Sequence, residues 1–143
     1  MTLPGDVELN TDTQDAQTIL VVDDDVRFLN LMHDVLQIQG YRVLKASNGT
    51  SGVELYQTHY PDLVFLDLSM PDMNGLQVLQ AIQGIDEAAK VVVITAYGTV
   101  ELAVAAMQQG AIDFVEKLHF TADFQDTLFK QVRLVLDEVN STD

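Results

Sequence analysis

Five polar residues of this 143-residue chain share one property: each comes within two residues after a short apolar run. They are Asp23, Asp24, Asp67, Thr95 and Lys117. Carboxylates that lie close together repel one another unless a cation or a proton compensates their charge. Mg²⁺ prefers such oxygen ligands, and a carboxylate can also act as a nucleophile toward a phosphoryl group. These residue types therefore suit phosphoryl transfer to a carboxylate with the help of Mg²⁺.

Asp67 is the candidate nucleophile, because it ends the unbroken apolar run 63–66, which suits a strand buried on both faces. The Lys117 ammonium would neutralise one phosphoryl oxygen as a compact charge, and the Thr95 hydroxyl would donate to another. The expected Mg²⁺ ligands are the carboxylates of Asp23, Asp24 and Asp67 and the carbonyl of Ser69.

The elements that must position these residues are five short strands, each followed by a helical pattern. The expected strands are 19–22, 41–46, 63–66, 91–95 and 112–116. This alternation indicates an α/β fold with right-handed crossovers and helices on both faces of the sheet. We expect a five-stranded doubly wound parallel sheet with five helices, in the flavodoxin-like order 2-1-3-4-5. The carboxyl ends of its strands would bring the five polar residues to one edge.

Apolar residues at helical spacing predict which side of the first and last helices is buried. In the first helix, 26–39, the stripe consists of Phe28, Leu31, Val35 and Ile38, and Gly40 follows as the C′ residue. In the last helix, which Thr121 would cap, it consists of Phe124, Leu128, Val132, Val135 and Val139.

We expect one domain over 18–139, a disordered acidic tail over 1–17 and a disordered end over 140–143.

Composition excludes several classes of function. The chain carries 22 acidic and 7 basic residues, a formal net charge of −15, whereas phosphate contacts need clustered Lys and Arg. Direct binding to nucleic acid or to an anionic membrane is therefore disfavoured. The absence of Cys excludes disulfides, thiol catalysis and thiolate metal sites. We see no secretory signal and no apolar run long enough to span a bilayer, so we expect a cytoplasmic protein.

Four blocks of sequence resemble the receiver domain of two-component response regulators, over about 18–138. They are VVDD at 21–24, VFLDLSMPDMNG at 64–75, VITAYG at 93–98 and FVEK at 114–117. The stretch 94–117 is most similar to receivers of the nitrogen-regulation class, which usually precede an ATPase and a DNA-binding domain. The sequence ends after the fifth expected helix, so we expect no output domain in it.

The resemblance implies that Asp67 accepts a phosphoryl group from a histidine kinase or a phosphotransfer protein, without turnover of an external substrate. It also implies that Asp24 is a direct Mg²⁺ ligand and that Asp23 acts largely through water. Thr95 resembles the switch hydroxyl and Phe114 the switch aromatic of the family, and Tyr97 is placed to slow loss of the phosphoryl group. The implied output is a changed face for a downstream protein partner, with a phosphorylation-dependent homodimer as a further candidate.

Other interpretations compete with this one. Asp25 suits a helix cap better than a metal ligand. The sequence pattern is equally consistent with Phe114 being an ordinary half-buried aromatic residue. A flavodoxin-type cofactor binder is disfavoured because Asp23 and its two acidic neighbours would repel a bound phosphate. A phosphatase is disfavoured because Ser69 stands where a second acid would be expected. A receiver-like interaction module that is never phosphorylated remains the alternative.

The sequence departs from the family pattern directly after Lys117. Receivers usually have a proline there, with a cis bond before it, whereas this chain has Leu118. A cis bond costs about 2.5–4 kcal/mol before a non-proline residue, against about 0.5–1 before proline. We therefore expect a trans 117–118 bond. We also expect His119 and Phe120 to make the following loop one residue longer than is usual in the family. Because strand five sets its backbone, Lys117 should still reach Asp67.

Overall fold

The computed structural model describes residues 16–70, 74–95, 100–117 and 120–137, with the backbone alone for residues 95 and 137. Five parallel strands form one sheet in the order β2-β1-β3-β4-β5. The predicted fold class and strand order are thus confirmed. The strands are β1 Thr18–Val22, β2 Arg42–Ala46, β3 Leu63–Asp67, β4 Val91–Thr95 and β5 Asp113–Glu116.

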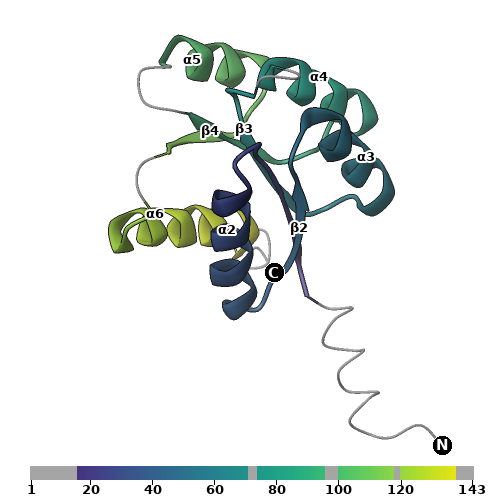
Figure 1. Cartoon of the computed structure of the whole chain (residues 1–143). Coiled ribbons are helices and arrows are strands. Elements are labelled where there is room, and N and C mark those ends of the chain that lie inside the picture. Colours follow the sequence, from purple (N-terminus) through teal and green to yellow (C-terminus); the bar gives the residue numbers. More distant parts are fainter. Residues whose placement is uncertain (1–15, 71–73, 96–99, 118–119, 138–143) are drawn as a thin grey trace, which may run out of the picture.

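Helices cover both faces of the sheet, as Figure 1 shows. On one face lie α2 Val26–Ile38 and α6 Ala122–Val132, the latter continued by a π-helical turn, η1 Arg133–Asp137. On the other face lie α3 Gly49–His59, α4 Gly75–Ile85 and α5 Val100–Gln109. The helix pairs α3–α4 and α4–α5 are in contact, so this second layer is continuous.

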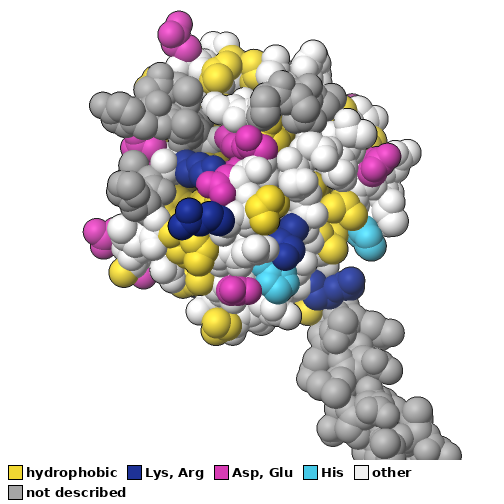
Figure 2. Space-filling model, viewed as in Figure 1, with side chains coloured by type: hydrophobic (Ala, Val, Ile, Leu, Met, Phe, Trp, Pro, Cys, Tyr) yellow, Lys and Arg dark blue, Asp and Glu magenta, His cyan; other side chains and the backbone are white. Residues whose placement is uncertain are grey.

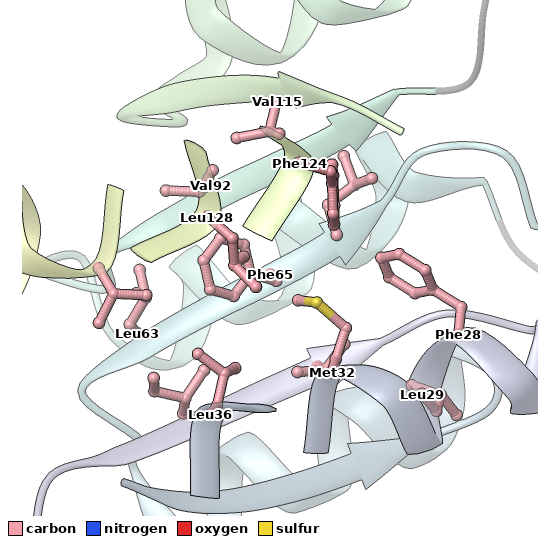
Figure 3. Close-up of a cluster of buried hydrophobic side chains, with 14 of the residues drawn as sticks. Phe28, Leu29, Met32, Leu36, Leu63, Phe65, Val92, Val115, Phe124 and Leu128 are labelled. Atoms are coloured by element: carbon pink, nitrogen blue, oxygen red, sulfur yellow. The ribbon is translucent and has the colours of Figure 1, made fainter. Parts of the chain in front are cut away.

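Successive side chains of a strand point to opposite faces of the sheet, and this divides the core into two clusters. In β3, Leu63 and Phe65 pack under α2 and α6, whereas Val64 and Leu66 pack under the other three helices. None of these four side chains is exposed to solvent, which confirms that the central strand is buried on both faces. Figure 3 shows the α2 and α6 cluster, which also contains Phe28.

The predicted apolar stripe of α2 was partly wrong. Its buried residues are Phe28, Leu29, Met32 and Leu36. Leu31 is 43% exposed and Ile38 is 81% exposed, while Val35 is partly buried. The helix carries two overlapping apolar series at spacings of three and four, and spacing alone does not say which of them meets the sheet.

Capping residues set the helix ends as the sequence indicates. Asp25 accepts hydrogen bonds from the backbone of Arg27 and Phe28, which confirms it as the N-cap of α2. Thr121 caps α6 through the backbone N–H of Phe124. Gly40, with a φ of 103°, follows α2 in the left-handed region that residues with a Cβ avoid.

The last helix ends differently from the prediction. Its hydrogen bonding changes to the π type at Arg133. Leu136, only 2% exposed, continues the four-residue spacing of the buried residues Leu128 and Val132, and Val135 is only partly buried. Val139 lies outside the described residues. The predicted stripe missed Leu136 because Val135 and Leu136, three and four residues after Val132, both fit the α-helical period.

The predicted tail and C-terminal end fall almost entirely on residues 1–15 and 138–143, which lie outside the described part of the chain. The domain boundaries therefore stay predictions. Within the described ranges, no helix is both long enough and apolar enough to cross a bilayer.

Candidate functional site

The sheet register brings the acidic residues together at one edge. Val22 of β1 pairs with Leu66 of β3, so Asp23 and Asp67 come next on adjacent strands. Alternate residues of a strand point to the same face of the sheet, and Val21, Phe65 and Val115 face α2 and α6. The residues two positions further on are Asp23, Asp67 and Lys117, so these side chains face the same side. The predicted convergence of strand ends is therefore present for these three side chains. In Figure 2, acidic and basic side chains lie next to one another in the upper half of the face shown.

Three carboxylates form the centre of the site. One oxygen from each of Asp23, Asp24 and Asp67 lies within 4.8 Å of the others. Asp23 is 0% exposed and Asp67 is 2% exposed, whereas Asp24 faces solvent. Burying carboxylates is costly unless hydrogen bonds and opposite charges compensate them. The contacts of the two buried acids are therefore informative.

Asp23 has two partners. Its Oδ2 accepts a hydrogen bond of 2.8 Å from Lys117 Nζ, and its Oδ1 accepts one of 2.8 Å from the backbone N–H of Asp25. Burial raises the pKa of Asp23, and these two donors counteract that rise. The Asp25 amide belongs to the start of α2, so the helix N-terminus also favours negative charge here.

Asp67 is less well compensated. Within the described residues its hydrogen-bond donor is the backbone N–H of Ser69, 2.9 Å from Oδ1. Burial raises the pKa of Asp67 to about 6; the Ser69 amide and the Lys117 charge lower it, and the Asp23 charge raises it further. Lys117 thus acts on Asp67 through its charge, while its hydrogen bond goes to Asp23. Among the described residues, no cation forms an ion pair with this buried carboxylate.

Gly75 has a role that the sequence pattern assigned only to a turn. A Cβ on this residue would lie 2.5 Å from Leu68 Cα and 2.9 Å from the Asp67 carbonyl oxygen. The Gly75 N–H donates to the Leu68 carbonyl at 3.2 Å, so the start of α4 presses against the backbone that follows Asp67. Any larger residue would push that backbone, and hence the Asp67 carboxylate, out of place.

The remaining predicted site residues are described only in part. Thr95 ends β4 beside Glu116 of β5, but its side chain lies outside the described atoms. Tyr97 and the 117–118 bond also fall there, so the expected trans isomer stays a prediction. Phe114 is 48% exposed and lines a surface hollow of about 460 Å³ between β5 and α6.

The three acids fit a hard divalent cation. They offer carboxylate oxygens, the donors that Mg²⁺ prefers, and the exposed side of Asp24 leaves room for the water ligands that Mg²⁺ retains. A cation bound there would also compensate Asp67, which has no close cationic partner among the described residues. The arrangement can hold a metal beside a buried carboxylate nucleophile.

Comparison with known proteins agrees with this geometry. The family model described as "Response regulator receiver domain" matches residues 19–131. The chemotaxis protein CheY of Bacillus subtilis is 39% identical over 109 residues, which cover 76% of this chain and 90% of CheY. The transcriptional regulatory protein ZraR of Escherichia coli is 36% identical over 118 residues, covering 82% of this chain but only 27% of ZraR.

A solved structure with a bound metal is also similar. It is the CheX–CheY–BeF₃–Mg²⁺ complex from Borrelia burgdorferi, with a TM-score of 0.73 and 30% identity, covering 83% of this chain and 88% of that one. The similar proteins thus include both chemotaxis and transcriptional regulators. The acidic pocket is typical of phosphoaccepting receivers, which are phosphoacceptors rather than enzymes that turn over a substrate. From its sequence, fold and acidic pocket, this chain belongs to the response regulator receiver domain family.

Proposed function

We propose that Asp67 accepts a phosphoryl group from a phosphohistidine of a histidine kinase or phosphotransfer protein. The observation that carries this proposal is the buried Asp67 carboxylate at the end of the central strand, within 4.8 Å of two further acids. An Asp67 oxygen forms a bond to phosphorus as the bond from phosphorus to the histidine nitrogen breaks. The imidazole leaves with that electron pair, and no further reactant is needed.

Mg²⁺ is the proposed cofactor. Its proposed ligands are Asp24 and Asp67 directly, Asp23 largely through water, and the Ser69 carbonyl. When bound, the ion neutralises charge on the phosphoryl oxygens and on the surrounding carboxylates. The exposure of Asp24 supports a direct role, since this carboxylate can turn toward an ion without losing an existing partner among the described residues.

Lys117 and Thr95 are proposed to bind the other phosphoryl oxygens. The Lys117 ammonium already lies at the site, bonded to Asp23, and only its flexible end must turn to meet a new anion. Thr95 ends the neighbouring strand, and its hydroxyl is a donor of suitable length. Loss of the phosphoryl group would be slowed by Tyr97.

The proposed output is a shift in a two-state equilibrium that involves Thr95 and Phe114. A phosphoryl group can shift such an equilibrium only through contacts that differ between the states, and a Thr95 hydrogen bond would supply one. The Phe114 side chain points outward and is half-exposed, which supports assigning the present structure to the unphosphorylated state. A downstream protein, or a second copy of the chain, would bind the altered face around α5 and β5.

The resemblance over 94–117 further supports placing this receiver with the nitrogen-regulation class. Sequence identity alone does not separate that class from the chemotaxis proteins, because ZraR and CheY are similarly close. This class assignment predicts a transcriptional output, and capture of a partner with the phosphorylated protein tests it.

Intact-mass measurement after incubation with Mg²⁺ and acetyl phosphate tests the central proposal. We expect one added phosphoryl group in the native protein, none in Asp67→Asn, and none in EDTA. A matched control is Asp62→Asn, which changes an exposed acid directly before the same strand. A chain that folds and binds Mg²⁺ but is never modified, by acetyl phosphate or by a phosphorylated phosphotransfer protein, would favour the unphosphorylated interaction module.

A further inference from the structure

The Lys117 side chain is held between an acid and an aromatic ring. Its ammonium lies 2.8 Å from Asp23 Oδ2 and 4.4 Å from the centre of the Phe28 ring. The side chain is only 19% exposed, and that of Asp23 is 0% exposed. An ammonium over a ring face at this distance is attracted by the ring's electrons, and more strongly where water is excluded. Phe28 therefore does more here than fill space.

The ring of Phe28 is itself fixed by two others. The Phe120 ring meets it edge-on at 6.0 Å between centres, and the Phe124 ring lies 6.0 Å away at a tilt of 60°. Phe120 and Phe124 also contact each other, with 5.4 Å between ring centres. Figure 3 shows Phe28 pointing from α2 toward Phe124 of α6. These three residues, Phe28, Phe120 and Phe124, form an aromatic cluster beneath the ammonium.

The aromatic cluster also includes Phe120, which lies close to Lys117 in the sequence. Phe120 follows Lys117 by three residues, and Leu118 takes the position where the family usually has proline. Packing of Phe120 on Phe28 ties Phe120 to α2.

A ring face orients an ammonium without using one of its hydrogen bonds. Lys117 has three N–H donors, and the Phe28 ring takes up none of them in a conventional hydrogen bond. The donors stay free for Asp23 and for an incoming anion. A polar neighbour at the same position would compete for a donor, whereas an aliphatic one would exert no attraction on the charge.

We propose that Phe28 is a positioning residue for Lys117, whose ammonium its ring face holds at the acidic pocket, ready to meet a phosphoryl oxygen. This inference rests on the proposed function of Asp67 as phosphoryl acceptor. It assigns to α2, through the first turn of the helix, a direct influence on the cation of the site. The alternative is that Phe28 is a core residue and nothing more.

The decisive substitution keeps the shape of the ring and removes its attraction for cations. Pentafluorophenylalanine is close to phenylalanine in size, but its ring face repels a cation. When pentafluorophenylalanine replaces Phe28, modification of Asp67 by acetyl phosphate at saturating Mg²⁺ should slow roughly three- to tenfold. The Mg²⁺ affinity should be unchanged. The same replacement at Phe124, which packs in the aromatic cluster, is the matched control and should leave the rate within about twofold. Phe28→Leu, which removes the attraction without adding repulsion, should also slow the reaction.

An NMR measurement tests the contact independently of phosphorylation. The ε-methylene protons of Lys117 should be shifted upfield by the Phe28 ring in the native protein and return toward ordinary values in Phe28→Leu. Unshifted Lys117 signals in the native protein, or equal rate losses at Phe28 and Phe124, would overturn the proposal. If Asp67 is not modified at all while these signals are shifted, the phosphoacceptor assignment fails and the positioning contact stands.

Discussion

The Lys117 ammonium is hydrogen-bonded to Asp23 at 2.8 Å, although the sequence led us to expect its main role at Asp67. One cation therefore serves two buried acids, one through a hydrogen bond and the other through its charge alone. The charge of Asp67 is only partly compensated, and a bound cation or a proton would compensate it further. The predictions about stability and metal binding follow from this imbalance.

Asp67 should make the metal-free protein less stable as the pH rises. Its pKa is raised from 3.8 to about 6 by burial, so between these values the folded state holds a proton that the unfolded state has released. Stability from this group is full below about pH 4 and is lost as the pH rises through about 6. Asp67→Asn removes the effect and should stabilise the metal-free fold by about 1–3 kcal/mol at neutral pH.

Urea unfolding in EDTA, at several pH values from about 4 to 7.5, measures this difference between the native protein and Asp67→Asn. Taking the difference cancels the contributions of the carboxylates that do not interact with Asp67. It should grow from near zero at the acid end and level off above about pH 6.5. A difference that stays constant across this range would show that Asp67 is not strained by burial.

Mg²⁺ should stabilise the native protein, because it relieves the repulsion among Asp23, Asp24 and Asp67 and binds only the folded site. Asp24→Asn should weaken Mg²⁺ binding at least about tenfold, since it removes one of the charges that attract the ion. Isothermal titration gives the affinity directly, and the shift of the melting temperature with added Mg²⁺ checks it.

Asp25→Asn is the control for that comparison. It removes the same charge one residue further along, while asparagine caps a helix about as well as aspartate. Its Mg²⁺ affinity should fall much less than that of Asp24→Asn. Equal losses in the two variants would mean that the ion responds to overall charge and that Asp24 is no ligand.

Leu136→Ala should be far more damaging than Leu134→Ala, although both replace a leucine in the same turn. Leu136 is 2% exposed and Leu134 is 55% exposed, since Leu136 lies four residues after the buried Val132 and Leu134 only two. We expect a loss of about 2–5 kcal/mol for the buried position and less than about 0.5 for the exposed one. Chemical unfolding measures both, and similar losses would argue against the packing of Leu136 in the core.

The sequence predicts the sheet well because its signals there are local and consistent. Buried runs such as 63–66, each followed by a helical pattern, leave few alternatives to a parallel sheet, and strand ends such as Asp67 then meet by topology. Side-chain partners are harder to predict from the sequence, because they depend on packing between distant elements. The pairing of Lys117 with Asp23 and with the Phe28 ring joins residues far apart in sequence.

The buried faces of helices are harder to predict than the sheet but easier than the side-chain partners. The α2 stripe was partly misassigned because Leu31 and Ile38 satisfy the helical period as well as Met32 does, and only contact with the sheet selects between them. The need for Gly75 was likewise visible only as a turn signal, since the close approach of Leu68 arises from how α4 docks. Tertiary packing decides both.

Phosphorylation should move the side chain at position 114 out of solvent. Phe114 is 48% exposed in the present structure, and the proposed switch requires a second state in which the ring is inward. Because the chain contains no tryptophan, Phe114→Trp would give a single fluorescent reporter. Acrylamide quenching of that tryptophan should fall by about half or more when beryllofluoride and Mg²⁺ are added as a phosphoryl analogue.

The control for this experiment combines Phe114→Trp with Thr95→Ala. If the Thr95 hydroxyl couples the phosphoryl group to the aromatic residue, the double variant should still bind the analogue but keep its quenching unchanged. Amide NMR shifts around Asp67 would confirm that the analogue is bound. Quenching that falls equally in both variants would mean that Thr95 does not transmit the signal. If quenching stays high in both, position 114 is an ordinary surface aromatic, and the altered face must be sought elsewhere on the domain.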